Sequence, residues 1–196
     1  MSANSDLRKQ IETTVNSFLA SYEDGRKAKD PSVINRDVTP DCTRQLLPAS
    51  LCKALGLPEE FLIPNDVYEK LYADDLSLGG VHNTVSKHLT IDVEARCAAV
   101  ESSGDMIYHH GETLHLEFSW VFYLTSDGTK ISRVIEFADS TAVLKMAASI
   151  LTLLDSVTVH GWPEPLNTYY LVKMIISLLF IRYCFITGQN SMTLPV

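Results

Sequence analysis

The stretch 115-HLEFSWVFYLTSDGTKISRVIEFADS-140 decides the fold, because apolar and polar residues alternate on both sides of Asp127-Gly128. Asp-Gly between two alternating runs is typical of a two-residue type I′ turn, in which both central residues have positive φ. If the neighbouring residues close this turn, Trp120 lies opposite Ile135 in a long antiparallel hairpin. The sequence therefore predicts an antiparallel sheet built around this hairpin.

Strict alternation would divide the hairpin into two faces. One face is apolar apart from Arg133, and the other is semi-polar and contains Glu136. We therefore expect a curved sheet with a partly polar cavity on the second face. Monomers avoid large unpartnered aromatic rows, so the apolar face predicts a homodimer interface near Phe118, Trp120 and Phe137. The semi-polar face carries His115, Glu117, Ser119, Val121, Tyr123, Ser132, Val134, Glu136 and Ala138.

The remainder of the chain predicts helices first and strands afterwards, which is an α+β pattern. An amphipathic helix is expected over 5–23, ended by Gly25, and Asp30-Pro31 starts a short helix. Asn65 is expected to cap a further helix that ends at Gly79-Gly80. The other expected elements are a strand over 41–47, helical turns over 49–55, strands over 89–93 and 97–101 separated from the hairpin by a turn at 102–105, and a helix over 143–154.

Composition excludes several classes of function. The net charge of −8 disfavours nucleic acid or an anionic membrane as the main partner, since both need a basic patch. The four cysteines show no zinc spacing and no secretory signal opens the chain, so a reduced, cytoplasmic protein is expected. No nucleotide-binding or serine-hydrolase motif occurs, and His109, His110 and Glu112 do not form a metal-binding pattern.

The composition changes after residue 154. We predict a domain over 1–154 and an extension over 155–196, with an apolar helix at about 168–187. The segment 169–187 has the length of a membrane span, but Lys173 and Arg182 would each cost about 2.5–3.5 kcal/mol at the bilayer centre. The alternatives are a helix packed on the domain or on a partner, and a tail that is foreign to the evolved domain.

Three segments carry a family resemblance: Asp41–Leu51 (DCTRQLLPASL), Thr125–Lys130 (TSDGTK) and Glu136–Ser140 (EFADS). The order of the expected elements, an N-terminal amphipathic helix, short helices and a curved sheet that ends in a hairpin, resembles the nuclear transport factor 2-like (SnoaL-like) cone fold. The three segments are more narrowly similar to the small fungal isomerases of this fold. These include the meroterpenoid isomerases of the terretonin and austinol type and the brevianamide-type semipinacolase. The resemblance covers about residues 5–147 and implies a homodimer that works without metal or organic cofactor. The segment 104–112 departs from the family pattern.

The resemblance implies two catalytic residues. Glu136 stands where a carboxylate of these enzymes projects into the cone, and a carboxyl in an apolar cavity has a raised pKa and can act as acid or base. Arg44 lies in the stretch where the brevianamide-type enzyme has an essential arginine, which could stabilise an enolate or pair with Glu136. The alternatives are an exposed sheet carboxylate for Glu136 and a structural ion pair for Arg44.

Further candidates follow from the faces of the hairpin. His115 could act as a general base beside Glu136, and Asp139 is either a second carboxylate or the cap of the following helix. Phe118 stands where the family would place a tyrosine, so Tyr68, Tyr72 or Tyr123 would supply a phenol. Together with Glu117 and Ser119, these tyrosines are the expected substrate-binding residues.

Two classes of function remain. The first is a cofactor-independent isomerase or cyclase for a terpenoid, polyketide or alkaloid intermediate, in which Glu136 moves a proton α to a carbonyl and Arg44 or a tyrosine holds the oxyanion. Ring expansion or a controlled rearrangement of a polycyclic compound suits such a site. The second is a non-catalytic module for ligand binding or dimerisation, since one fold hosts many functions.

Overall fold

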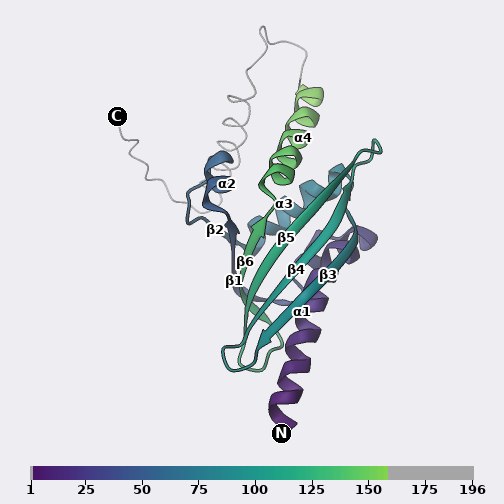
Figure 1. Cartoon of the computed structure of the whole chain (residues 1–196). Coiled ribbons are helices and arrows are strands. Elements are labelled where there is room, and N and C mark those ends of the chain that lie inside the picture. Colours follow the sequence, from purple (N-terminus) through teal and green to yellow (C-terminus); the bar gives the residue numbers. More distant parts are fainter. Residues whose placement is uncertain (1, 159–196) are drawn as a thin grey trace, which may run out of the picture.

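A computed structural model describes residues 2–158 of the 196-residue chain as an α+β domain. Six strands form one mixed, curved sheet in the order β2-β1-β6-β5-β4-β3, and α1 and α3 lie on the same side of it (Figure 1). Strand β1 pairs parallel with β6 and antiparallel with β2. The elements are α1 (Ser2–Ala28), η1 (Pro31–Asn35), β1 (Val38–Leu47), α2 (Ala49–Ala54), β2 (Leu62–Pro64), α3 (Asn65–Leu78), β3 (Val81–Asp92), β4 (Cys97–Ile107), β5 (Thr113–Leu124), β6 (Ile131–Ala138) and α4 (Ser140–Thr158).

The hairpin of β5 and β6 is present, but its turn differs from the predicted one. The Gly128 N–H donates to the Thr125 carbonyl at 2.9 Å, and the Thr125 N–H donates to the Lys130 carbonyl at 2.9 Å. Within this turn only Gly128 has positive φ (71°), so the type I′ prediction was wrong. Asp127 instead accepts hydrogen bonds from Thr125 and Thr129, which organise a longer loop.

A bulge in β6 changes the predicted register. Leu124 lies opposite Ile131 as expected, but Trp120 lies opposite Glu136 rather than Ile135. The register shift falls between Tyr123 and Leu124, and it lets both Ile131 and Val134 enter the core, where each is fully buried. A slip of one residue moves every following side chain to the other face. Glu136 therefore shares a face with Trp120, which the unbroken pattern excludes.

The aromatic face of the hairpin is the core of the protein, not its outer surface. Trp120 is 2% exposed and Phe122 is fully buried, and Phe18 of α1 packs against both rings edge to face. The predicted dimer surface near Phe118, Trp120 and Phe137 was therefore wrong for Trp120, which packs against α1, whereas Phe137 is exposed and the homodimer stays a prediction. The α1 residues in this core are Ile11, Val15, Phe18 and Leu19.

Gly25 lies inside α1 and does not end it. The helix continues to Ala28, and a Cβ atom at position 25 would lie 2.6 Å from the Tyr72 hydroxyl. Glycine is therefore required by the close approach of α1 and α3 rather than by a helix end. Tyr72 in turn donates to the Tyr22 carbonyl at 2.5 Å, which joins the two helices.

Two other expectations fail for the same reason, which is that tertiary contacts override local preference. The residues 102–105 continue strand β4 and do not form a turn, since β4 pairs with β3 and β5 on its two sides and the Ser102 hydroxyl accepts a hydrogen bond from the Trp120 indole at 2.8 Å. Asn65 makes no side-chain cap on α3 and binds other groups with its amide. The Asp30 cap of η1 is confirmed.

The C-terminal predictions fall largely beyond the described residues. Helix α4 runs through position 154 to Thr158, and the extension with its apolar segment 169–187 lies outside residues 2–158. The domain boundary at 154 therefore stays a prediction. None of the helices in the described part of the chain has the length and apolar character needed to cross a membrane.

Candidate active site

Glu136 points to the side of the sheet that α1 and α3 cover. It is half-buried, and the Tyr68 hydroxyl donates to its Oε2 at 3.3 Å. Burial raises the pKa of this carboxyl to about 7, while the Tyr68 hydrogen bond and the charge of Arg44 oppose the rise. A carboxyl with this pKa exists in both protonation states near neutral pH, which is the property that an acid/base catalyst requires.

Two tyrosines extend the contact made by Glu136. The hydroxyls of Tyr22 on α1 and Tyr68 on α3 lie 2.6 Å apart. Because Tyr68 donates its only proton to Glu136, Tyr22 must donate to Tyr68, and the chain runs from Tyr22 through Tyr68 to Glu136. Burial and the negative charge of Glu136 raise the pKa of both phenols, so they stay protonated. Tyr68 is therefore the phenol in direct contact with Glu136, and its proton becomes free for another acceptor once Glu136 takes up a proton.

Arg44 lies on the same face of the sheet but is buried, with 1% of its surface exposed. Its guanidinium donates to the Asn65 amide oxygen at 2.8 Å, to the Asn35 amide oxygen at 3.0 Å and to the Ile34 carbonyl at 3.3 Å. It also lies over the Tyr68 ring, 4.2 Å from the ring centre. No salt bridge joins it to Glu136 among the described residues.

Among the described residues no ion pair joins Arg44 to Glu136, so that part of the prediction is not confirmed, while a role of Arg44 toward a substrate stays a prediction. Its donors serve η1 and the first residue of α3, and this anchors the helix that carries Tyr68. Its positive charge acts on Glu136 from a distance and favours the ionised carboxylate. The hydrogen bonds of Arg44 therefore connect β1 to η1 and α3.

Asp75 is a second carboxyl in this region. It is half-buried on α3, and burial together with the charges of Asp74 and Glu136 raises its pKa to about 7. Its negative charge in turn raises the pKa of Tyr22. We call the group of Tyr22, Tyr68, Asp75 and Glu136 the tyrosine–carboxyl cluster. Each of its members keeps some accessible surface although burial dominates its pKa.

The other predicted site residues lie elsewhere. His115, Glu117, Ser119 and Tyr123 are exposed on the opposite face of β5, so the prediction that they share the face of Glu136 was wrong. The bulge in β6 is the physical reason. His115 binds Asp105 at 2.8 Å on the outer surface, and Tyr123 stacks near Arg133. These contacts do not reach the tyrosine–carboxyl cluster.

Asp139 and Tyr72 have structural contacts. The Asp139 carboxylate accepts the backbone N–H groups of Thr141 and Ala142 at 2.9 and 3.3 Å, and it therefore caps α4, which was one of its two predicted roles. Tyr72 is 2% exposed and binds the Tyr22 carbonyl, so it forms part of the contact between α1 and α3.

Within residues 2–158, no three His, Cys, Asp or Glu side chains are grouped so that they could hold a metal ion.

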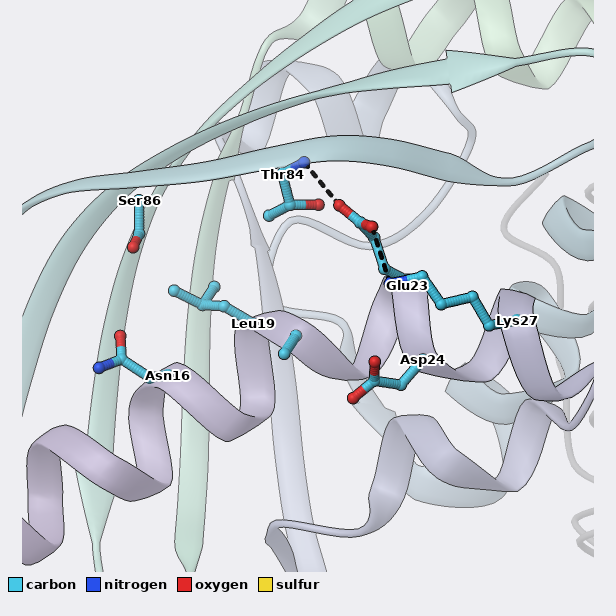
Figure 2. Close-up of a pocket in the computed structure, with 8 residues that line it drawn as sticks. Asn16, Leu19, Glu23, Asp24, Lys27, Thr84 and Ser86 are labelled. Carbon is cyan, nitrogen blue, oxygen red and sulfur yellow. Dashed lines mark hydrogen bonds and ion pairs between the residues drawn. The ribbon is translucent and has the colours of Figure 1, made fainter.

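A cavity lies between α1 and the edge strand β3, away from the tyrosine–carboxyl cluster, and we call it the α1–β3 pocket (Figure 2). Its volume is about 340 Å³. Glu23 points into it, accepts the Thr84 backbone N–H at 2.8 Å and lies 3.3 Å from the Lys27 ammonium. These contacts, the backbone hydrogen bond above all, lower the pKa of Glu23, so this carboxylate stays ionised. Its lining residues are Asn16, Leu19, Ala20, Glu23, Asp24, Lys27, Thr84 and Ser86.

Tyr22 and Asp75 were not predicted as site residues from the sequence. Tyr22 was part of the apolar stripe of the N-terminal helix, where an aromatic ring is expected to be core. Asp75 follows Tyr68 by seven residues and Tyr72 by three, which places all three on one face of a helix. A carboxyl on the buried face of an amphipathic helix was therefore the available signal.

Comparison with known proteins identifies the fold family of the domain. No family model and no curated protein matches the sequence. Among solved structures, the chain is similar to the BvnE pinacolase from Penicillium brevicompactum, with 20% identity and a TM-score of 0.60 over 78% of this chain and 97% of that one. It is also similar to PrhC from Penicillium brasilianum, with 13% identity and a TM-score of 0.60 over 78% and 94% of the two chains.

A bacterial structure connects the chain to the same architecture. A SnoaL-like polyketide cyclase from Jannaschia is 12% identical, with a TM-score of 0.51 over 70% of this chain and 90% of that one. Sequence identities at this level indicate a shared fold but not a shared reaction. The chemistry therefore has to be inferred from the site itself. The chain has the SnoaL-like cone fold, as the predicted order of its elements implies.

Proposed function

We propose that this protein with the SnoaL-like cone fold is a cofactor-independent isomerase or cyclase, and that its substrate is a polycyclic carbonyl compound of terpenoid or polyketide origin. The observation that carries the proposal is Glu136, a half-buried carboxyl with a pKa of about 7 that is hydrogen-bonded to Tyr68. The fold likeness to a pinacolase and to a polyketide cyclase supports it, since both names denote rearrangement or ring closure.

The reaction would begin with enolisation. The Glu136 carboxylate takes a proton from the carbon next to the carbonyl, and the developing oxyanion accepts a hydrogen bond from Tyr68. Return of the proton to a different carbon or a different face gives an isomer of unchanged formula. Tyr68 contacts Glu136, and Trp120 is the partner of Glu136 on β5. Trp120 in turn packs against Tyr22 and Phe118, and these aromatic side chains suit a rigid and mostly apolar ligand.

Deuterium exchange tests the proposal without knowledge of the natural substrate. We expect the protein in D₂O to accelerate exchange of the α-protons of 1-tetralone, a bicyclic ketone, as measured by mass spectrometry. Glu136→Gln should reduce the enzyme-dependent rate by about 10²–10⁴-fold, the range for general acid–base catalysis. Glu23→Gln is the matched control, because it changes a glutamate at the α1–β3 pocket. Full exchange by Glu136→Gln would contradict the proposal, whereas binding of 1-tetralone with no exchange by wild type would favour the binding module.

We also propose that two copies of the chain associate through the outer face of β5 and β6. Phe137 is 51% exposed and Tyr123 is 39% exposed on this face, next to half-buried Val121 and Ile135. Sedimentation velocity at micromolar concentration should show a dimer for wild type and a monomer for Phe137→Glu. Leu62→Glu, which changes an exposed residue of β2 at the sheet edge, should remain a dimer.

A further inference from the structure

Tyr22 is held in place by three aromatic neighbours. Its ring meets those of Phe18 and Tyr72 edge to face, at centroid distances of 6.2 and 5.8 Å, and it lies 6.2 Å from the Trp120 ring. Its backbone carbonyl also accepts the Tyr72 hydroxyl at 2.5 Å. Close packing of this kind restricts a side chain to one rotamer, so the Tyr22 hydroxyl has a fixed position.

The Tyr22 hydroxyl has one hydrogen-bond partner within residues 2–158, which is the Tyr68 hydroxyl at 2.6 Å. Tyr68 is held from a second direction, because the Arg44 guanidinium lies over its ring, 4.2 Å from the ring centre. With the ring and the oxygen held, the remaining motion of this phenol is rotation of its O–H bond. That rotation decides which acceptor receives the proton, and Glu136 receives it in the structure.

Donation by Tyr22 affects the strength of the next hydrogen bond. A phenol oxygen can accept two hydrogen bonds and donate one. Because a hydroxyl that accepts a hydrogen bond is polarised by it, it donates more strongly, and the effect is larger away from bulk water. Tyr22 therefore directs the Tyr68 proton away from itself and strengthens its donation to the acceptor that it meets.

We propose that Tyr22 is a positioning residue of the active site, which orients the Tyr68 hydroxyl so that the same phenol serves first Glu136 and then the substrate oxygen. This inference rests on the proposed function and goes beyond it, since it assigns a residue that acts through Tyr68. When Glu136 takes the α-proton, the C–H bond breaks, its electron pair passes to the carbonyl oxygen, and an O–H bond forms on the carboxyl.

The Tyr68 hydroxyl then turns to the new oxyanion and keeps its own proton. Tyr22 still donates to Tyr68, so the phenol oxygen stays in place while its O–H bond changes acceptor. Return of the proton from Glu136 to carbon ends the need for the oxyanion contact, and Tyr68 donates to the carboxylate again. The two phenols are unchanged over the cycle, and the product is an isomer of the substrate.

Several elements contribute titratable groups around Glu136. Tyr68 from α3 and Arg44 from β1 act on this carboxyl, and its own charge acts on Tyr22 from α1 and on Asp75 from α3. The variant Tyr22→Phe removes one phenol hydroxyl and leaves the other groups in place. It also keeps the ring and the backbone carbonyl of residue 22, so the packing around it should be retained.

Carbon-13 NMR of protein labelled at the glutamate carboxyls tests the coupling without any substrate. The Glu136 signal, assigned by its loss in Glu136→Gln, should titrate near pH 7 in wild type. In Tyr22→Phe it should titrate at higher pH, because a weaker hydrogen bond from Tyr68 stabilises the carboxylate less. The matched control is Tyr72→Phe, which removes a phenol hydroxyl from the same contact between α1 and α3 and should leave the titration unchanged.

A purely structural role of Tyr22 would lower the melting temperature of Tyr22→Phe without moving the Glu136 titration. That result would overturn the inference.

Exchange kinetics show whether Tyr22 acts through Tyr68. Tyr22→Phe should reduce kcat for 1-tetralone exchange by about 3–10-fold, the equivalent of one neutral hydrogen bond, with KM nearly unchanged. In the Tyr68→Phe background the same substitution should cause no further loss, because the residue through which it acts has been altered. Equal losses in the two backgrounds would contradict the proposed role.

The same measurements separate failure of this inference from failure of the proposed function. If Tyr22→Phe has the wild-type exchange rate and the wild-type Glu136 titration while Glu136→Gln does not exchange, the proposed function stands and the role of Tyr22 is refuted. Absence of exchange by wild type would instead refute the proposed function, and the catalytic part of this inference with it.

Discussion

Glu23 and Glu136 are both partly buried glutamates, yet their surroundings act in opposite directions. In the α1–β3 pocket, Glu23 receives a backbone N–H at 2.8 Å and the Lys27 ammonium at 3.3 Å, and its pKa is lowered. Glu136 receives one phenol at 3.3 Å, and burial raises its pKa to about 7. The pKa of a partly buried carboxyl is therefore set by the number of its hydrogen-bond donors relative to its desolvation, and not by its place in a cavity.

Of the substitutions predicted below, replacement of Arg44 should reduce the free energy of unfolding the most. Arg44→Lys keeps the charge but cannot reproduce the fork that binds Asn35, Asn65 and the Ile34 carbonyl. We expect the free energy of unfolding to fall by about 2–4 kcal/mol, since buried partners lose their hydrogen bonds. Chemical denaturation measures this loss. Arg36→Lys is the control, because that half-exposed arginine pairs with Asp24 and Asp37, and a comparable loss there would contradict the special role of Arg44.

Stability as a function of pH should separate the two glutamates. The pKa of Glu136 rises from 4.5 to about 7 on folding, so the folded protein holds an extra proton between these values and its stability falls as pH rises through this window. Glu136→Gln should match wild type near pH 4 and be more stable at pH 8 by about 1–3 kcal/mol. Thermal unfolding across this pH range measures the difference. Equal stability at both pH values would mean that Glu136 titrates normally.

Removal of single phenols should distinguish the tyrosines. Tyr68→Phe deletes the donor to Glu136, which should raise the pKa of that carboxyl further and reduce 1-tetralone exchange by about 10–100-fold, the equivalent of one charge-assisted hydrogen bond. Tyr72→Phe deletes a bond to a backbone carbonyl and should cost about 1 kcal/mol of stability with exchange retained. Retained exchange in Tyr68→Phe together with lost exchange in Tyr72→Phe would place Tyr72 in the site.

Substitution of Glu23 in the α1–β3 pocket should have the smallest effect on stability. Glu23 has a lowered pKa in the folded protein, so it contributes stability above its unfolded pKa, and this contribution is lost as pH falls through the folded value. Glu23→Gln should therefore reduce stability at pH 7 by about 0.5–1 kcal/mol and have no effect in strong acid. Exchange activity should be unchanged. A large loss of exchange would move the functional site to this pocket.

The sequence by itself determined the features that depend on near neighbours along the chain. The alternation around Asp127-Gly128 predicted the β5–β6 hairpin, and Asp30-Pro31 predicted the start of η1. The α+β class and the cone fold were also predicted, the latter from the order of the expected elements. These predictions hold because turn, cap and alternation preferences act over a few residues. Glu136 and Tyr68 were named as candidates from the sequence, but the contact between them was not.

Only the tertiary structure decided which side chains share the interior. The bulge in β6 brings Ile131 and Val134 into one core and turns Glu136 toward Tyr68, and no residue of the hairpin signals it in the sequence. The same packing buries Arg44, places Asp75 near Tyr22, and leaves His115 on the outer face. The physical reason is that apolar burial fixes strand register and helix contacts across the whole domain, while sequence pattern records only the alternation within each strand.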